Sequence, residues 1–142
     1  MTILVAALAA MLFQAPVPAA WTWTLYEGEG PLVLANEVSD TPQLKTTLEC
    51  EPGSGVARVS LYDSGIGAGF ANVSAGDASA TAETDAARAG RAVVAIRTDH
   101  PVFSRFVADG ALTVTVGEAK ASVEVQASHL PKLRRFAELC GG

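Results

Sequence analysis

The clearest alternation of apolar and polar positions runs from Leu112 to Val125. At its middle, Gly117 and Glu118 form a two-residue loop with glycine first, which is typical of a type II′ turn. A slip of one residue would move the apolar side chains to the other face, so the pattern predicts the register of a β-hairpin. The pairs that face each other are Val116 with Ala119, Val114 with Ala121, and Leu112 with Val123.

Alternation elsewhere predicts further strands. Trp21, Trp23 and Leu25 share one face of the first of them, and Cys50 lies on the apolar face of the third. A turn rich in glycine joins the third strand to the fourth as a hairpin with a longer loop. The predicted strands are 21–26, 32–35, 43–50, 56–62 and 91–98.

Residues 64–90 carry a weaker pattern, because they are rich in Gly, Ala, Ser, Thr and Asp. Two interpretations remain open for this stretch. Residues 70–73 and 80–84 form strands with little side-chain burial, or the whole stretch is a mobile loop.

A short helix is predicted after the strand at 91–98. Asp99 is a suitable N-cap, and Pro101 is favoured in a first helical turn. Phe103, Phe106 and Val107 then recur on one helical face, and Asp109-Gly110 ends the helix.

A second helix is predicted from His129 to Leu139 or Cys140, with Ser128 as its cap. One face of this helix is apolar and includes Cys140; its members are Leu133, Phe136, Ala137 and Cys140. The fold class that follows is mainly β, a single-domain sandwich or partly open barrel of about seven or eight strands. It carries two short helices, the last of them C-terminal.

The first 20 residues have no charged side chain, and residues 3–13 are an apolar run. This run is shorter than the roughly 20 residues that span a bilayer. It is followed by small residues, which predicts a signal peptide at 1–19 and a β-rich domain at 20–142. The leader lacks the usual Lys or Arg at its start. A buried N-terminal helix is the rival interpretation, but Pro16 and Pro18 would end it.

Export to the periplasm or outside the cell changes the expectation for the two cysteines, since an oxidising compartment permits a disulfide. Cys50 and Cys140 both lie on apolar faces, which predicts that they are bonded to each other. No CxxC motif and no metal-ligand spacing occurs, so we expect neither metal nor cofactor. The net charge of −5 disfavours nucleic acid as a partner. Once the leader is removed, we expect no membrane span.

One local grouping is suggestive of catalysis, namely Asp99, His100 and Ser104. No nucleophile elbow accompanies it, so we expect a helix cap and surface residues, and no catalytic residue. The glycine-rich run at 65–70 lacks the pattern of a phosphate-binding loop. Asn72-Val73-Ser74 is a glycosylation sequon, relevant only in a eukaryotic secretory pathway.

Two groups of residues are candidates for a binding surface. The alternation of the first strand favours packing of Trp21 and Trp23 in the core, and stacking on a sugar or a peptide is the alternative. Lys132, Arg134 and Arg135 form a basic patch opposite the apolar face of the last helix. Such a patch suits an acidic partner, or it is only the solvated face of the helix.

The last third of the chain, from Asp99-His100-Pro101-Val102-Phe103 to a closing helix of the form L-x-x-F-x-x-x-C, resembles the ending of some small exported proteobacterial proteins. These are the accessory periplasmic proteins of type VI secretion loci and the invasion-associated locus B group. The resemblance implies the same architecture and cysteine pairing, and no functional residue.

The function expected from the sequence is that of an exported, non-enzymatic binding or accessory protein that meets another envelope protein. The alternatives are an inhibitor or envelope-stress protein that contacts a secreted enzyme, or a hydrolase with unrecognised residues. The ligand and the oligomeric state stay open.

Overall fold

The computed structural model describes residues 20–85 and 90–141, which form nine strands and two α-helices. The predicted signal peptide at 1–19 lies outside the described residues. The elements in chain order are β1 (Trp21–Tyr26), β2 (Leu32–Val38), β3 (Leu44–Cys50), β4 (Val56–Tyr62), β5 (Gly69–Ala75), β6 (Ala78–Thr84), β7 (Arg91–Arg97), α1 (Pro101–Asp109), β8 (Ala111–Val116), β9 (Ala119–Glu124), a 3₁₀ turn (Ala127–His129) and α2 (Leu130–Gly141).

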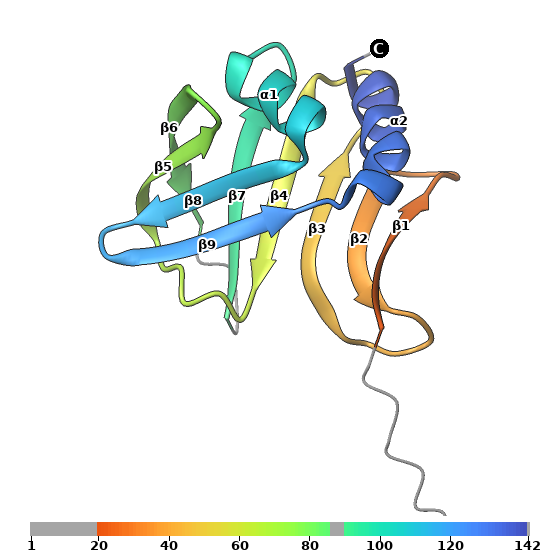
Figure 1. Cartoon of the computed structure of the whole chain (residues 1–142), viewed down its shortest axis with the longest axis horizontal. Coiled ribbons are helices and arrows are strands. Elements are labelled where there is room, and N and C mark those ends of the chain that lie inside the picture. The colour runs from red at the N-terminus through yellow and green to blue at the C-terminus, as the bar shows by residue number, and fades with distance from the viewer. Residues whose placement is uncertain (1–19, 86–89, 142) are drawn as a thin grey trace, which may run out of the picture.

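The strands form two antiparallel sheets in a sandwich, which confirms the predicted mainly β class (Figure 1). One sheet has the order β1-β2-β3-β4-β7, and the other has the order β6-β5-β8-β9. Among the residues that the structure describes, their edges meet through one isolated bridge between Asp85 and Val93, and the sheets do not close into a barrel. Both helices lie at the same end of the sandwich, so the opposite end is left to strand ends and turns (Figure 1).

The β8–β9 hairpin has the predicted register at every facing pair. Gly117 begins the turn with a φ of 58°, a conformation that glycine adopts without a steric penalty. Leu112, Val114 and Val123 are buried in the core. The local pattern was sufficient here because the turn and the apolar face specify the same register.

The stretch after residue 64 contains β5 and β6, so the strand interpretation is correct there and the loop interpretation is wrong. Small side chains suffice for burial because α1 packs directly on these strands. Ala71, Val73 and Ala75 are all buried beneath it. The hydroxyl of Thr84 also donates to the carbonyl oxygen of Gly67 at 2.7 Å, which holds the preceding loop in place. Residues 86–89 lie outside the described part.

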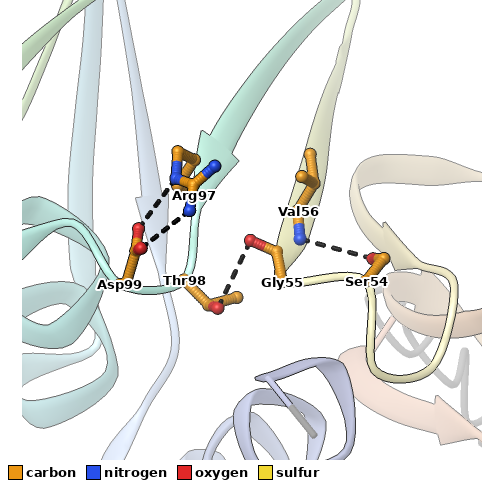
Figure 2. Close-up of polar contacts among 6 residues, drawn as sticks. All are labelled: Ser54, Gly55, Val56, Arg97, Thr98 and Asp99. Atoms are coloured by element: carbon orange, nitrogen blue, oxygen red, sulfur yellow. Dashed lines mark hydrogen bonds and ion pairs between the residues drawn. The ribbon is translucent and has the colours of Figure 1, made fainter.

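The N-cap of α1 is His100, and the prediction of Asp99 is wrong. The backbone N–H of Val102 donates to Nδ1 of His100 at 3.0 Å. Asp99 instead accepts two hydrogen bonds from the guanidinium of Arg97, at 2.9 and 2.8 Å (Figure 2). A bidentate arginine is a stronger partner for the carboxylate than a backbone N–H, so the neighbouring histidine takes the cap.

A disulfide joins Cys50, at the end of β3, to Cys140 in the last turn of α2, as predicted. The loop between β3 and β4 reinforces this junction. Its backbone N–H groups at Gly53 and Gly55 donate to the carbonyl oxygens of Leu139 and Cys140 at 3.0 and 2.9 Å. These are helix-end carbonyls that have no partner inside the helix.

Thr98, which follows β7, ties the same loop to the second half of the chain. Its N–H and its hydroxyl both donate to the carbonyl oxygen of Gly55, the hydroxyl at 3.3 Å. Figure 2 shows the hydroxyl contact. Ser54 accepts from the N–H of Val56 on the other side of this glycine. The end of α2, the β3–β4 loop and the end of β7 are therefore one connected unit.

The start of α2 differs from the prediction. Ser128 does not cap the helix, because it lies inside a 3₁₀ turn that precedes Leu130. The apolar face is as expected, with Leu133, Phe136 and Cys140 fully buried. Within the two described segments, no helix is long and apolar enough to cross a membrane.

Candidate binding cleft at the open end of the sandwich

The two tryptophans predicted as binding residues have different environments. Trp23 is only 1% exposed, and its indole Nε1 donates to the carbonyl oxygen of Glu124 at 3.0 Å. The core interpretation is correct for Trp23, so this residue does not belong to a binding surface, because the start of α2 and the end of β9 cover this part of β1. Trp21 is 36% exposed at the first position of the same strand.

Trp21 lies at a hollow of about 500 Å³, which we call the Trp21 cleft. The size falls within the range of small-molecule sites, about 300–1,000 Å³. In antiparallel strands, the start of one strand lies beside the end of its neighbour, so β1, β3 and β4 bring distant residues to this end of the sandwich (Figure 1). The cleft is lined by Trp21, Pro42, Gln43, Leu44, Tyr62 and Asp63.

Two cations lie against the aromatic rings of the cleft. Nζ of Lys45 is 4.4 Å from the centroid of the Trp21 ring. The guanidinium of Arg91 is 5.7 Å from the Tyr62 ring and also donates to the hydroxyl of Ser60. Both contacts are within the reach of cation–π attraction, which favours one orientation of each ring. The cleft therefore combines oriented aromatic surfaces with charge.

A second hollow of about 310 Å³ adjoins the Trp21 cleft and shares Tyr62 and Asp63 with it. It extends between the two sheets to the outer edge of β9, where Ser122 and Glu124 line it. Asn36 and Thr46 contribute amide and hydroxyl groups from the other sheet. The two hollows together offer hydrogen-bond donors and acceptors around two aromatic rings.

The sequence did not identify most of this cleft. Gln43 lies just before β3 and Tyr62 and Asp63 lie at the end of β4, and no local motif connects them, or Lys45, to Trp21. The sequence did contain one indication of the cleft. Each of these residues lies near the end of a predicted strand, and strands that pair as consecutive hairpins place such ends at the same end of the sheet. Using that indication required the sheet order, which the sequence pattern left open.

The predicted basic patch does not form one free surface. Nζ of Lys132 donates to the backbone oxygen of Trp23 at 2.6 Å, which ties α2 to β1. Arg135 forms an ion pair with Glu27 at 2.9 Å. Arg134 is exposed and makes no ion pair with the residues that the structure describes. Two of the three cations thus hold the helix on the sheet, and none lines the Trp21 cleft.

The grouping of Asp99, His100 and Ser104 is arranged for structure. His100 uses Nδ1 for the helix cap, and Asp99 faces Arg97. Hydrogen bonding to Arg97 lowers the pKa of the Asp99 carboxyl below its usual value. Over 20–85 and 90–141, no cluster of His, Cys, Asp or Glu has the arrangement of a metal site.

Comparison with known proteins found no matching family model, no matching curated protein and no matching solved structure. The resemblance of the last third to accessory periplasmic proteins therefore stays a prediction.

Proposed function

We propose that this protein is an exported, non-enzymatic binding protein that holds its partner at the Trp21 cleft. The observation that carries the proposal is a partly exposed indole, oriented by Lys45, at the mouth of a hollow of about 500 Å³. Leaving an aromatic ring in water forgoes the free energy of its burial. A partner that covers the ring would recover that free energy.

The chemistry of the cleft favours a partner with both flat apolar surface and polar groups, such as a segment of another envelope protein. Aromatic side chains with one apolar face and nearby polar groups are enriched where proteins bind each other. Gln43 and Asp63 supply an amide and a carboxylate beside the two rings. These groups give a partner direction and specificity, while Trp21 supplies contact area.

Export is the second part of the proposal. It rests on the apolar leader at 1–19 and on the disulfide between Cys50 and Cys140, since disulfides persist in oxidising compartments. Sequencing the N-terminus of the protein from its native host tests this part. We expect a mature chain that begins at Ala20, and a mature chain that begins at Met1 would contradict export.

The binding part is tested by capture from an envelope extract with three versions of the protein, followed by mass spectrometry. We expect the unmodified protein to retain a specific partner, and Trp21→Ala to retain at least tenfold less of it. Phe70→Ala is the matched control, because Phe70 is 77% exposed on β5 and does not line the cleft. Equal retention by the two variants would contradict binding at the cleft. If the partner is a secreted enzyme, an assay of its activity distinguishes an inhibitor from an accessory protein.

A further inference from the structure

The outer edge of β9 is unpaired in the sandwich, since β9 is the last strand of its sheet. The hairpin determines which of its backbone groups face outward. In a two-residue loop the residues on either side, Val116 and Ala119, are bonded to each other. Ladder bonds then alternate along the strand, so the N–H and C=O groups of Lys120, Ser122 and Glu124 point away from β8.

One observation agrees with this assignment. The carbonyl oxygen of Glu124 accepts its hydrogen bond from Trp23, which lies on the side away from β8.

The edge is unpaired and accessible at Lys120 and Ser122, while the carbonyl oxygen of Glu124 is already bonded to Trp23. Lys120 and Ser122 make no backbone hydrogen bond on this side to any residue that the structure describes. The side chains of Lys120, Ser122 and Glu124 are all exposed, and the edge borders the hollow of about 310 Å³. An accessible edge of this kind is a template for another strand unless a charge deters it.

We propose that this edge joins two copies of the chain, with their β9 strands antiparallel about a twofold axis at Ser122. In this register Lys120 of one copy faces Glu124 of the other, and the symmetry makes the same pair a second time. Centring the axis on Lys120 or on Glu124 would instead place like charges opposite each other, which is destabilising. Lys120 disfavours pairing of this edge with other strands, but Glu124 of a second copy attracts it.

The pairing predicts a weak dimer. One strand of six residues buries less surface than the roughly 1,600 Å² of a standard stable interface. We therefore expect dissociation in the micromolar range or weaker, so that the chain is monomeric when dilute and dimeric when concentrated. This inference does not depend on the function of the Trp21 cleft.

Sedimentation equilibrium tests the pairing with the protein recovered from the periplasm of an expression host. We expect the average mass to rise toward that of a dimer with concentration. Lys120→Glu and Glu124→Lys should each weaken dimerisation about tenfold or more, because each places two like-charged pairs across the axis. The double variant with both changes should restore it. Glu83→Lys, which reverses an exposed charge on the other edge strand of the same sheet, is the matched control and should have no effect.

A cysteine at the axis tests the register separately. Residues that face each other in a bonded antiparallel pair have Cα atoms about 5.5 Å apart, within the range of a disulfide. Ser122→Cys should therefore cross-link two copies on oxidation, and Ser79→Cys on β6 should not. A chain that stays monomeric up to about 1 mM would overturn the inference. So would a dimer that the single charge reversals do not weaken, or that the double variant does not restore. Pairing of β9 with a strand of a different protein, without self-association, would also overturn it.

Discussion

Replacing Gly110 with alanine tests the junction between α1 and β8. Gly110 ends α1 with a φ of 78°, and its N–H donates to the carbonyl oxygen of Phe106 at 2.6 Å. Its own carbonyl oxygen accepts from the N–H of Val125 at 2.7 Å, which holds the end of β9 beside the helix. A methyl group here would overlap the carbonyl oxygen of Val125 and lie 2.9 Å from Cδ2 of Leu130, closer than the 3.0 Å limit that real Cβ atoms respect.

Two costs add in the Gly110→Ala variant. The left-handed backbone costs an alanine about 1–2 kcal/mol. Overpacking against a backbone oxygen costs about 1–3 kcal/mol, because the oxygen belongs to a bonded segment that cannot move aside freely. We therefore expect a loss of about 2–5 kcal/mol in the free energy of unfolding. That is a large share of the roughly 5–15 kcal/mol that stabilises a typical domain.

Urea unfolding measures the loss, and Gly65→Ala is the control. Gly65 has almost the same φ, 77°, but nothing lies within 4 Å of an added Cβ. It should lose only the backbone cost of about 1–2 kcal/mol. Gly110→Asn should remain strongly destabilised, because asparagine tolerates the backbone but still carries the clashing Cβ. Equal losses in Gly110→Ala and Gly65→Ala would refute the reasoning.

Three further outcomes are expected. Cys140→Ser should lower the free energy of unfolding by up to about 4–5 kcal/mol, the chain-entropy value for a loop of 90 residues; an unchanged urea midpoint would contradict this. Trp23→Ala should cost about 3–5 kcal/mol and Trp21→Ala clearly less, since the first leaves a core cavity and the second removes a ring that is already partly exposed; a reversed order in calorimetry would contradict the assignment of their environments. By NMR titration, the pKa of Asp99 should lie below 3.8 and rise in Arg97→Gln. Because the folded pKa is depressed, the small stabilisation from this pair is present above the ordinary pKa and is lost as the pH falls through the folded value.

The features that could be predicted from the sequence are those with local causes. The β8–β9 register follows from the turn at Gly117 and from apolar residues within a few positions of it. The disulfide followed from two separate periodicities, one placing Cys50 and the other Cys140 on buried faces. In both cases local patterns determined the answer, and no distant residue competed with them.

The wrong predictions share a different cause, which is competition from a neighbour. Asp99 has the composition of an N-cap, but Arg97 holds its carboxylate, and His100 caps the helix. The sequence pattern predicts that Lys132 is a solvated cation. Its ammonium group instead donates to the backbone oxygen of Trp23, which is more than a hundred residues away in the chain. Periodicity cannot anticipate a partner of this kind.

The cleft could not be predicted from the sequence, because it depends on the topology of the sheet. Its residues meet only because β1, β3 and β4 all begin or end at the same side of the sandwich. Trp21 was identified because tryptophan is conspicuous, and Trp23 was assigned with it because both lie on the same face of one strand. Their environments differ because α2 packs on β1 at Trp23, whereas Trp21 lies at the first position of the strand and stays partly exposed.

The long separation between Cys50 and Cys140 has a consequence for the order of events during biogenesis. At about 5–20 residues per second, roughly 5–20 s pass between the synthesis of the two cysteines. During this interval β1 to β4 can pair as consecutive hairpins, but the thiol of Cys50 has no partner in its own chain. A chain truncated after Glu124 should therefore keep an alkylatable thiol at Cys50. The bond therefore requires that the chain extends through the last turn of α2, so a free thiol at Cys50 would mark an unfinished chain.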